Sequence, residues 1–142
     1  MAAGTGEQTI LAAKRVGPIG SVLATDIAAQ MLKITAETAQ QAGLSNVTTQ
    51  VMDAEQLDVE AESFDAAISR LGLMFIPDLL EALTGIRRAL KPGGKLAAIV
   101  VSSAEKDRYL ALPLGLLLRS RGADQHVKRL LEGGHPEIVG DL

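Results

Sequence analysis

The 142-residue sequence contains no cysteine and no tryptophan, and Phe64, Phe75 and Tyr109 are its only aromatic residues. The absence of cysteine excludes disulfide bonds, thiolate metal sites and cysteine nucleophiles, and it suits a cytoplasmic protein. Because aromatic residues are scarce, we expect a core of Ala, Leu, Ile and Val. A planar ligand is then expected to lie mostly against aliphatic side chains.

A basic surplus and a long apolar run are also missing. The sequence has 14 Lys and Arg against 17 Asp and Glu, a formal net charge of −3, which argues against binding to nucleic acid or anionic lipid. The most apolar run, Tyr109–Leu118, is too short to span a bilayer. Hydrophobic residues make up 47% of the chain, a globular balance, and the length fits a single domain over residues 1–142.

Short β-branched or apolar runs alternate with longer segments of helical spacing. The runs predict strands and the spaced segments predict helices. The expected strands are Ser21–Asp26, Val47–Met52, Phe64–Ser69 and Lys95–Val101, and the expected helices are Glu7–Arg15, Ala28–Ala42 and Pro77–Leu90. This alternation with short connections predicts an α/β fold, a Rossmann-like doubly wound and mostly parallel sheet with flanking helices.

The segment Pro77–Leu90 shows the clearest helical pattern. Pro77 suits the first turn of a helix, and apolar residues from Leu79 to Leu90 share one face. Pro92-Gly93-Gly94 is expected to stop this helix and to turn the chain into the next strand.

A glycine turn, Gly4-Thr5-Gly6, opens the first predicted helix. Two glycines permit a tight turn and the close approach of a ligand, and a helix N-terminus supplies N–H donors. An ordinary strand-to-helix turn has the same appearance. The dinucleotide fingerprint places a third Gly or Ala three residues after Gly6, where this sequence has Thr9. This mismatch disfavours a pyrophosphate ligand.

No strand precedes the glycine turn in this sequence, although the first strand of a doubly wound sheet is central. We therefore expect a gap between two buried neighbours, whose backbone groups would lack partners there. The sequence is interpreted as a partial domain that lacks its first strand and its last strands. An exposed gap favours association with a second copy or with a partner chain.

Acidic residues end the next two predicted strands. Asp26 lies 20 positions after Gly6, a spacing at which a carboxylate accepts the ribose hydroxyls of a nucleoside cofactor; alternatively, it caps the following helix. Asp53 can accept from the amine of a purine while the N–H of Ala54 donates to a ring nitrogen, or it can form a turn with its own backbone. Because ligands of open α/β sheets bind at the carboxyl ends of strands, these features together indicate a nucleoside site.

The order of the motifs resembles that of class I S-adenosylmethionine-dependent methyltransferases, and most closely the branch around the ubiquinone and menaquinone C-methyltransferases. The resemblance covers roughly residues 2–103. Its matching segments are Ala3-Gly4-Thr5-Gly6, Asp26–Leu32, Asp53-Ala54-Glu55, Ser63-Phe64-Asp65, Arg70–Phe75 and Lys91-Pro92-Gly93-Gly94.

The resemblance implies S-adenosylmethionine as cofactor and methyl transfer to a small-molecule acceptor. It also implies the positions of ten residues around that cofactor. These are Ala3, Gly4, Thr5 and Gly6 at the methionine part, Asp26 at the ribose, Ile27 and Met31 near the adenosine, Asp53 and Ala54 at the adenine, and Arg70 close by. In full-length relatives the region of Ala104–Arg121 tends to cover the substrate pocket, which suggests an apolar, quinone- or lipid-like acceptor. A plain buried helix, or a partner-facing patch left by truncation, is the favoured alternative.

The sequence departs from the family pattern in three places. The first strand and its acidic residue are absent, Ala28 stands where a capping Ser is common, and the match fades after Val101. No Ser-His-Asp set and no metal-spaced cluster appears, so neither a catalytic residue nor a metal ligand is assigned. His126 and His135 are expected to be solvated.

Two other classes of function stay open at this point. An NAD(P)-dependent Rossmann oxidoreductase is disfavoured by Thr9 and by the match at Asp53-Ala54-Glu55. A non-catalytic, partner-dependent remnant would keep the fold without the activity. Arg70 is expected either to orient an acidic substrate or to form an ordinary ion pair.

Overall fold

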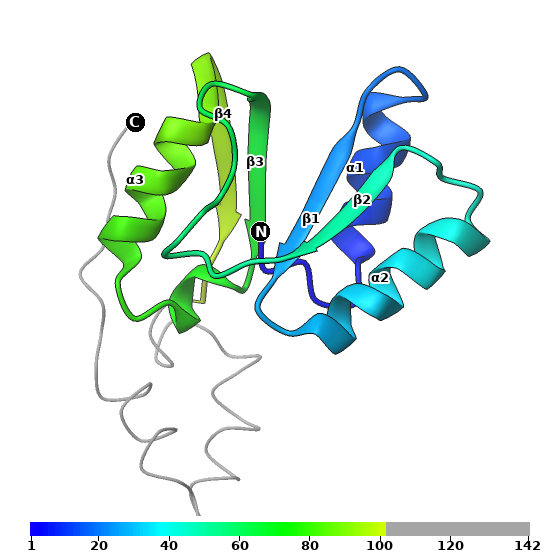
Figure 1. Cartoon of the computed structure of the whole chain (residues 1–142), viewed down its shortest axis with the longest axis horizontal. Coiled ribbons are helices and arrows are strands. Elements are labelled where there is room, and N and C mark those ends of the chain that lie inside the picture. The colour runs from blue at the N-terminus through cyan, green and yellow to red at the C-terminus, as the bar shows by residue number, and fades with distance from the viewer. Residues whose placement is uncertain (102–142) are drawn as a thin grey trace, which may run out of the picture. The chain divides into compact units, whose positions relative to one another are not determined.

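Helices and strands alternate in the computed structural model, which describes residues 1–101 (Figure 1). Residues Met1–Val100 form one compact unit. Its elements are α1 (Glu7–Val16), β1 (Val22–Asp26), α2 (Ala29–Gln41), β2 (Val47–Val51), β3 (Phe64–Arg70), the 3₁₀ helix η1 (Leu73–Phe75), α3 (Leu79–Ala89) and β4 (Leu90–Ile99). The α/β class predicted from the sequence is confirmed.

The ends of α3 and β4 differ from the prediction. Helix α3 begins at Leu79 and not at Pro77, because Asp78 is its N-cap and accepts a hydrogen bond from the backbone N–H of Glu81 at 3.0 Å. Strand β4 begins at Leu90, so that Pro92-Gly93-Gly94 lies within the strand and not before it. This segment bulges out between two rungs of the ladder, Phe64↔Leu90 and Ala66↔Lys95.

The strands form two separate parallel pairs. β1 pairs with β2 from Val22↔Val47 to Asp26↔Val51, and β3 pairs with β4 up to Arg70↔Ile99. Within residues 1–101, no ladder joins β1 to β3. The predicted gap between the two inner strands is therefore confirmed.

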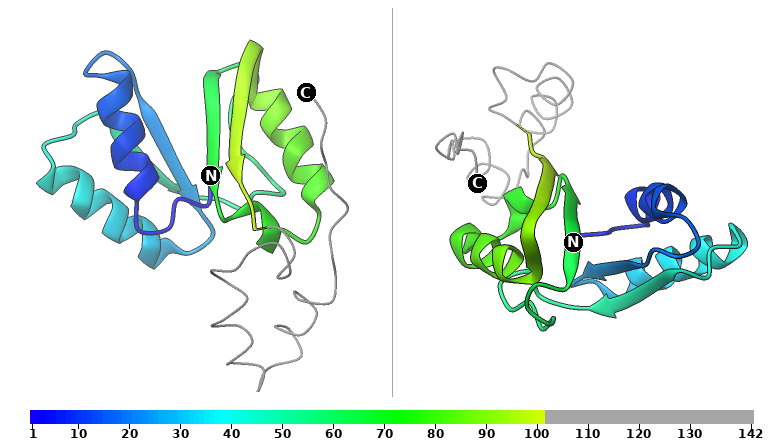
Figure 2. Two further views of the ribbon diagram at one scale, coloured as in Figure 1. Left: turned by 180° about the vertical axis from the view of Figure 1, so that it is seen from behind. Right: turned by 90° about the horizontal axis from the view of Figure 1, so that it is seen from above.

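Residues 1–3 enter this gap at one end, between β3 and β1 (Figures 1 and 2). The amino group of Met1 donates to the carbonyl of Ile68 at 3.1 Å, and the N–H of Ala3 donates to the carbonyl of Thr25 at 3.0 Å. Burial lowers the pKa of the Met1 amino group, and the negative charge of Asp26 opposes this shift. A cavity of about 30 Å³ lies beside these residues, lined on the strands by Val22, Leu23, Ala24, Ile68 and Arg70.

The core is built from small and aliphatic side chains, as the scarcity of aromatic residues predicted. Helices α1 and α2 pack against β1, α2 also packs against β2, and α3 packs against β4. The buried hydrophobic residues are Ala13, Ala24, Leu32, Ala39, Met52, Leu73, Ala82, Ile86 and Ala89. None of the helices in residues 1–101 combines the length and the hydropathy needed to cross a membrane.

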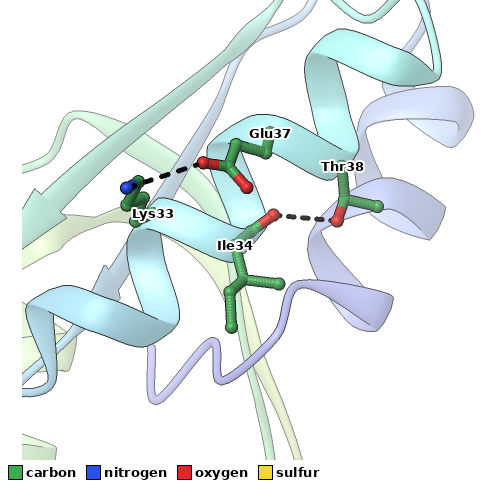
Figure 3. A network of polar contacts seen from close by, with 4 residues as sticks. All are labelled: Lys33, Ile34, Glu37 and Thr38. Carbon is green, nitrogen blue, oxygen red and sulfur yellow. Dashed lines mark hydrogen bonds and ion pairs between the residues drawn. The ribbon is translucent and has the colours of Figure 1, made fainter.

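Helix α2 has one polar and one buried face. On the polar face, Lys33 Nζ lies 4.0 Å from Glu37 Oε1, and the hydroxyl of Thr38 donates to the carbonyl of Ile34 at 2.8 Å (Figure 3). On the buried face, Leu32, Thr35 and Ala39 are shielded from solvent. The helix therefore directs a polar side chain, Thr35, into the interior.

Candidate functional site

The glycine turn lies beside the carboxyl end of β1. Gly4 has φ +55° and Gly6, the N-cap of α1, has φ +94°. Such left-handed conformations are readily adopted by glycine and strained for other residues. The turn thus requires glycine for its backbone, and no side chain caps the first turn of α1.

Asp26 joins the turn to the following helix. Its Oδ2 accepts a hydrogen bond from the N–H of Gly4, and its Oδ1 accepts one from the N–H of Ala28, both at 2.9 Å. Ala28 is the N-cap residue of α2, and the second bond is donated by the N–H of Ala28 itself, so that α2 has no side-chain cap. An ionised carboxylate has about four acceptor positions, so these two bonds leave about two of them for a ligand.

Thr35 supports the turn from the other side. Its hydroxyl donates to the carbonyl of Gly4 at 2.9 Å, and its side chain is fully buried. A Cβ on Gly6 would lie 2.9 Å from both Oγ1 and Cγ2 of Thr35, closer than real Cβ contacts. Sequence reasoning missed Thr35; its place on the inward face of α2, three residues after Leu32, is the signal that would have drawn attention to it.

Asp53 and Ala54 follow the neighbouring strand, β2. The N–H of Met52 donates to the carbonyl of Asp26 at 3.0 Å, which keeps the two strand ends adjacent. Asp53 is exposed, and its Oδ1 accepts from the N–H of Glu55 at 3.0 Å, which is the turn contact foreseen for it. The second carboxylate oxygen, Oδ2, has no partner among the hydrogen bonds of residues 1–101.

Two apolar side chains stand next to Asp26 at the start of α2. Ile27 is 72% exposed and Met31 is 41% exposed. They lie between the strand that carries Asp26 and the buried part of the helix. Their side chains are therefore accessible to an apolar ring.

Arg70, the last residue of β3, reaches across to the first turn of α1. Its Nη1 lies 2.8 Å from Oε2 of Glu7, so that the ion pair considered for this arginine is present. The pair borders a cavity of about 160 Å³, lined by Ala2, Ala3, Gly4, Thr5, Glu7, Gln8 and Arg70. Sequence reasoning did not select Glu7, although an acidic residue directly after a glycine turn was a visible signal.

The structure therefore joins Asp26 to the turn by a hydrogen bond and places the turn and Arg70 around one cavity, with Asp53 at the adjoining strand end. The predictions for His126, His135 and Ala104–Arg121 lie outside the described residues.

Comparison with known proteins places the sequence in a family. A family profile described as a methyltransferase domain matches residues 1–94. A demethylmenaquinone methyltransferase of Listeria welshimeri is 37% identical over 99 residues, which cover 70% of this chain and 42% of the relative. One from Staphylococcus aureus strain JH9 is 39% identical over 99 residues, with 70% and 40% covered. The chain spans about two fifths of the length of these curated relatives.

Solved structures show the same fold. The protein PH0226 of Pyrococcus horikoshii matches with a TM-score of 0.66 and 28% identity, covering 88% of this chain and 56% of that one. The [4+2]-cyclase SpnF matches with a TM-score of 0.63 and 28% identity, covering 68% and 35%. A methyltransferase of Aquifex aeolicus, described as S-adenosylmethionine-dependent, has a TM-score of 0.69, 24% identity and coverage of 75% and 56%, which shows the fold alone.

The name of SpnF illustrates that a shared fold does not fix the reaction. The profile match and the sequence identity carry the assignment instead. The cofactor of the matched family is S-adenosylmethionine. The chain belongs to the class I S-adenosylmethionine-dependent methyltransferase family, and it is similar to the demethylmenaquinone methyltransferases.

Proposed function

We propose that this chain binds S-adenosylmethionine along the carboxyl ends of β1, β2 and β3 and serves methyl transfer to an apolar small-molecule acceptor. The observation that carries the proposal is the 2.9 Å hydrogen bond from the N–H of Gly4 to Oδ2 of Asp26. This bond holds the carboxylate of Asp26 at the glycine turn. The carboxylate is suited to bind a ribose, and the turn lets a ligand approach the backbone.

The nucleoside part is assigned to the ends of β1 and β2. The unused acceptor positions of Asp26 would receive the ribose hydroxyls, and Ile27 and Met31 would pack against the adenosine. The unpartnered Oδ2 of Asp53 would accept from the adenine amine, and the N–H of Ala54 would donate to a ring nitrogen.

The methionine part is assigned to the 160 Å³ cavity next to the turn. Ala3, Gly4 and Thr5 border this space with backbone and small side chains, Arg70 closes one side of it, and Gly6 completes the turn. The two assignments meet at Asp26, which contacts the turn directly.

Bound S-adenosylmethionine supplies an electrophilic methyl group on a sulfonium. The displacement that follows needs alignment of donor and acceptor and exclusion of water. The described residues contribute alignment, through a turn that Asp26 and Thr35 hold from two sides. No catalytic base is assigned.

An apolar, quinone-like acceptor is favoured by the relatives, which are named for demethylmenaquinone. Two exposed apolar side chains, Leu71 and Phe75, follow Arg70 at the carboxyl end of β3. They follow the strand end at which Arg70 borders the cavity assigned to the methionine part. Association of a second copy or of a partner chain with the gap between β1 and β3 stays a prediction.

Calorimetric titration with S-adenosylhomocysteine, beside NADH, tests the cofactor. We expect saturable binding of S-adenosylhomocysteine alone, weakened about tenfold or more in Asp26→Ala, since hydrogen bonds to a charged group contribute about 1.5–3 kcal/mol. Asp65→Asn is the matched control, because Asp65 lies at the opposite end of β3. Circular dichroism establishes that each variant is folded.

Two results would contradict the proposal. Binding of NADH alone would indicate an oxidoreductase. Binding of neither ligand by a folded chain would indicate a non-catalytic remnant. The acceptor is tested by transfer of a labelled methyl group to demethylmenaquinone and to a polar catechol. Equal labelling of both acceptors would contradict an apolar acceptor site.

A further inference from the structure

The segment between β2 and β3 runs along helix α3 and is fastened to it near both ends of the helix (Figure 1). At the start of α3, Oε1 of Glu55 accepts a hydrogen bond from the N–H of Asp78 at 2.9 Å. In the last turn, Nη2 of Arg88 donates to the carbonyl of Leu57 at 2.6 Å. Leu57 also lies beside Gly85, where an added Cβ would be 3.4 Å from its side chain. The segment that follows β2 is therefore attached to α3 as well as to its own strand.

Glu55 is the residue of this segment that links Asp53 to α3. Its N–H donates to Oδ1 of Asp53 at 3.0 Å, and its carboxylate accepts from Asp78, the N-cap residue of α3. A hydrogen bond to a charged acceptor is stronger than one between neutral groups, and negative charge is favourable at the start of a helix. Two hydrogen bonds on one residue thus connect the carboxyl end of β2 with the start of α3.

The chain between β3 and α3, which we call the β3–α3 connection, is held at its two ends. At the first end, the N–H of Leu71 donates to the carbonyl of Ile99 at 2.7 Å, and at the second end Glu55 holds the N–H of Asp78. Leu71 has φ +59°, a left-handed conformation that is strained for leucine and persists only where neighbouring contacts enforce it. Between these ends lies η1, whose Phe75 is 63% exposed. Glu55 therefore fixes one end of a strained connection that carries exposed apolar side chains.

We propose that Glu55 is a positioning residue, which transmits the binding of a ligand at Asp53 to the β3–α3 connection. The inference rests on the proposed function, because it takes Asp53 as a cofactor contact and takes Leu71 and Phe75 as the acceptor side. Oδ2 of Asp53 is the atom assigned to the cofactor, while its Oδ1 holds Glu55. A bound cofactor thus restrains Glu55, and through it the N–H of Asp78. Cofactor binding then prepares the acceptor side by holding the connection in one conformation.

Hydrogen exchange of three backbone amides, measured by NMR, tests the inference. Phe75 and Ile76 donate within the connection, and Asp78 donates to Glu55. In the wild-type chain we expect saturating S-adenosylhomocysteine to slow their exchange about tenfold, the effect of one hydrogen bond to a charged group. 5′-Methylthioadenosine, which carries the adenine but no amino acid, should produce the same slowing. The slowing is measured relative to the amide of Gly17, at the far end of α1, which reports any general stabilisation by the ligand.

Three variants separate transmission from a purely structural role. Glu55→Ala removes the acceptor of the Asp78 N–H, and we expect it to abolish the ligand-dependent slowing while the chain still binds S-adenosylhomocysteine. Because coupling between two sites is reciprocal, the affinity should fall by no more than the same factor, about tenfold. Glu55→Gln keeps a side-chain oxygen that can accept from Asp78, and it should retain most of the slowing. Asp58→Ala removes an exposed carboxylate from the same segment and is the matched control, with slowing and affinity as in wild type.

Three results would overturn the inference. Slowing that persists in Glu55→Ala would show that ligand binding reaches the connection by another route. Slowing with S-adenosylhomocysteine but not with 5′-methylthioadenosine would assign the effect to the amino-acid end of the ligand. A wild-type chain that binds ligand without slower exchange in the connection would show that the two regions are not coupled, while the cofactor site stands. A wild-type chain that binds neither ligand would instead remove the proposed function itself.

Discussion

The two strand pairs hold their functional side chains in different ways. At the end of β1, Asp26 is half-buried and bonded to two backbone N–H groups, and Thr35 is fully buried against the same turn. At the end of β3, Arg70 is exposed and has one exposed partner, Glu7. The β1–β2 half is therefore preorganised, whereas the β3–β4 half offers a charge that can change its partner at little cost.

This difference fits the two ends of the proposed cofactor. A nucleoside is a rigid group whose hydroxyls and ring atoms require fixed partners. A methionine chain is flexible and ends in two full charges, which suit an exposed ion pair that separates at little cost. No ladder joins β1 to β3 within residues 1–101, although residues 1–3 donate to Ile68 of β3 and to Thr25 of β1, so the two halves share few backbone hydrogen bonds.

The largest expected effect comes from a substitution that tests how strongly the two halves are coupled. Ile86→Ala removes a buried side chain of α3 and is expected to destabilise the chain by about 2–5 kcal/mol. Hydrogen exchange measures the protection of the backbone amides. This protection should fall more in α3, β3 and β4 than in β1 and β2. A uniform loss of protection in both halves would show that they unfold as one cooperative unit.

The next effect tests the preorganised turn. Gly6→Ala places a Cβ 2.9 Å from Thr35 at φ +94° and is expected to cost about 2–4 kcal/mol by denaturant unfolding. Gly43→Ala is the matched control, since Gly43 has φ +68° and open space around its Cβ position, so that only about 1–2 kcal/mol of backbone strain is expected. Equal losses in the two variants would mean that Thr35 does not pack against the turn.

A smaller effect is expected from one hydroxyl group. Thr35→Val keeps the side-chain shape but leaves the carbonyl of Gly4 without its donor, at a cost of about 1–3 kcal/mol. Thr38→Val removes the exposed hydroxyl on the polar face of α2 (Figure 3) and should change stability by less than about 0.5 kcal/mol. Thermal unfolding of both variants measures the difference, and a Thr35→Val protein as stable as wild type would refute the support assigned to Thr35.

The smallest effect is expected at the exchangeable pair. Glu7→Gln in the absence of ligand should lower stability by no more than about 1 kcal/mol, and the loss should shrink further in high salt. Urea unfolding at low and at high ionic strength measures this. A loss of several kcal/mol would place the pair among the fixed contacts of the fold and would remove the contrast between the two halves.

Much of the architecture was predictable because it depends on local patterns. Alternating β-branched runs and helical spacing identified the strands and helices to within a few residues, apart from the start of β4. That strand starts earlier than predicted because its pairing with Phe64 extends the ladder past the bulge at Pro92-Gly93-Gly94. A ladder partner 26 residues away outweighed the local turn signal of proline and glycine.

The candidate site was predictable only in part. Glycines and carboxylates at strand ends identified Gly4, Gly6, Asp26 and Asp53, because these residue types have few roles at such positions. Thr35 was not identified, because its place on the inward face of α2 was visible but nothing local indicated its contact with Gly4. The turn contact foreseen as the alternative for Asp53 is present, whereas Asp26 bonds to the N–H of Ala28 and does not cap α2, whose N-cap residue is Ala28. Both carboxylates still leave acceptor positions for a ligand.

The sequence by itself determined the order of elements and the chemical character of the strand ends, since both follow from residues that are close together in the chain. Only the tertiary structure decided that Thr35 reaches Gly4 across 31 positions and that Arg70 reaches Glu7 across 63. The physical reason is that parallel pairing brings distant strand ends to one edge of the fold, while side-chain packing selects which of the groups gathered there make contact.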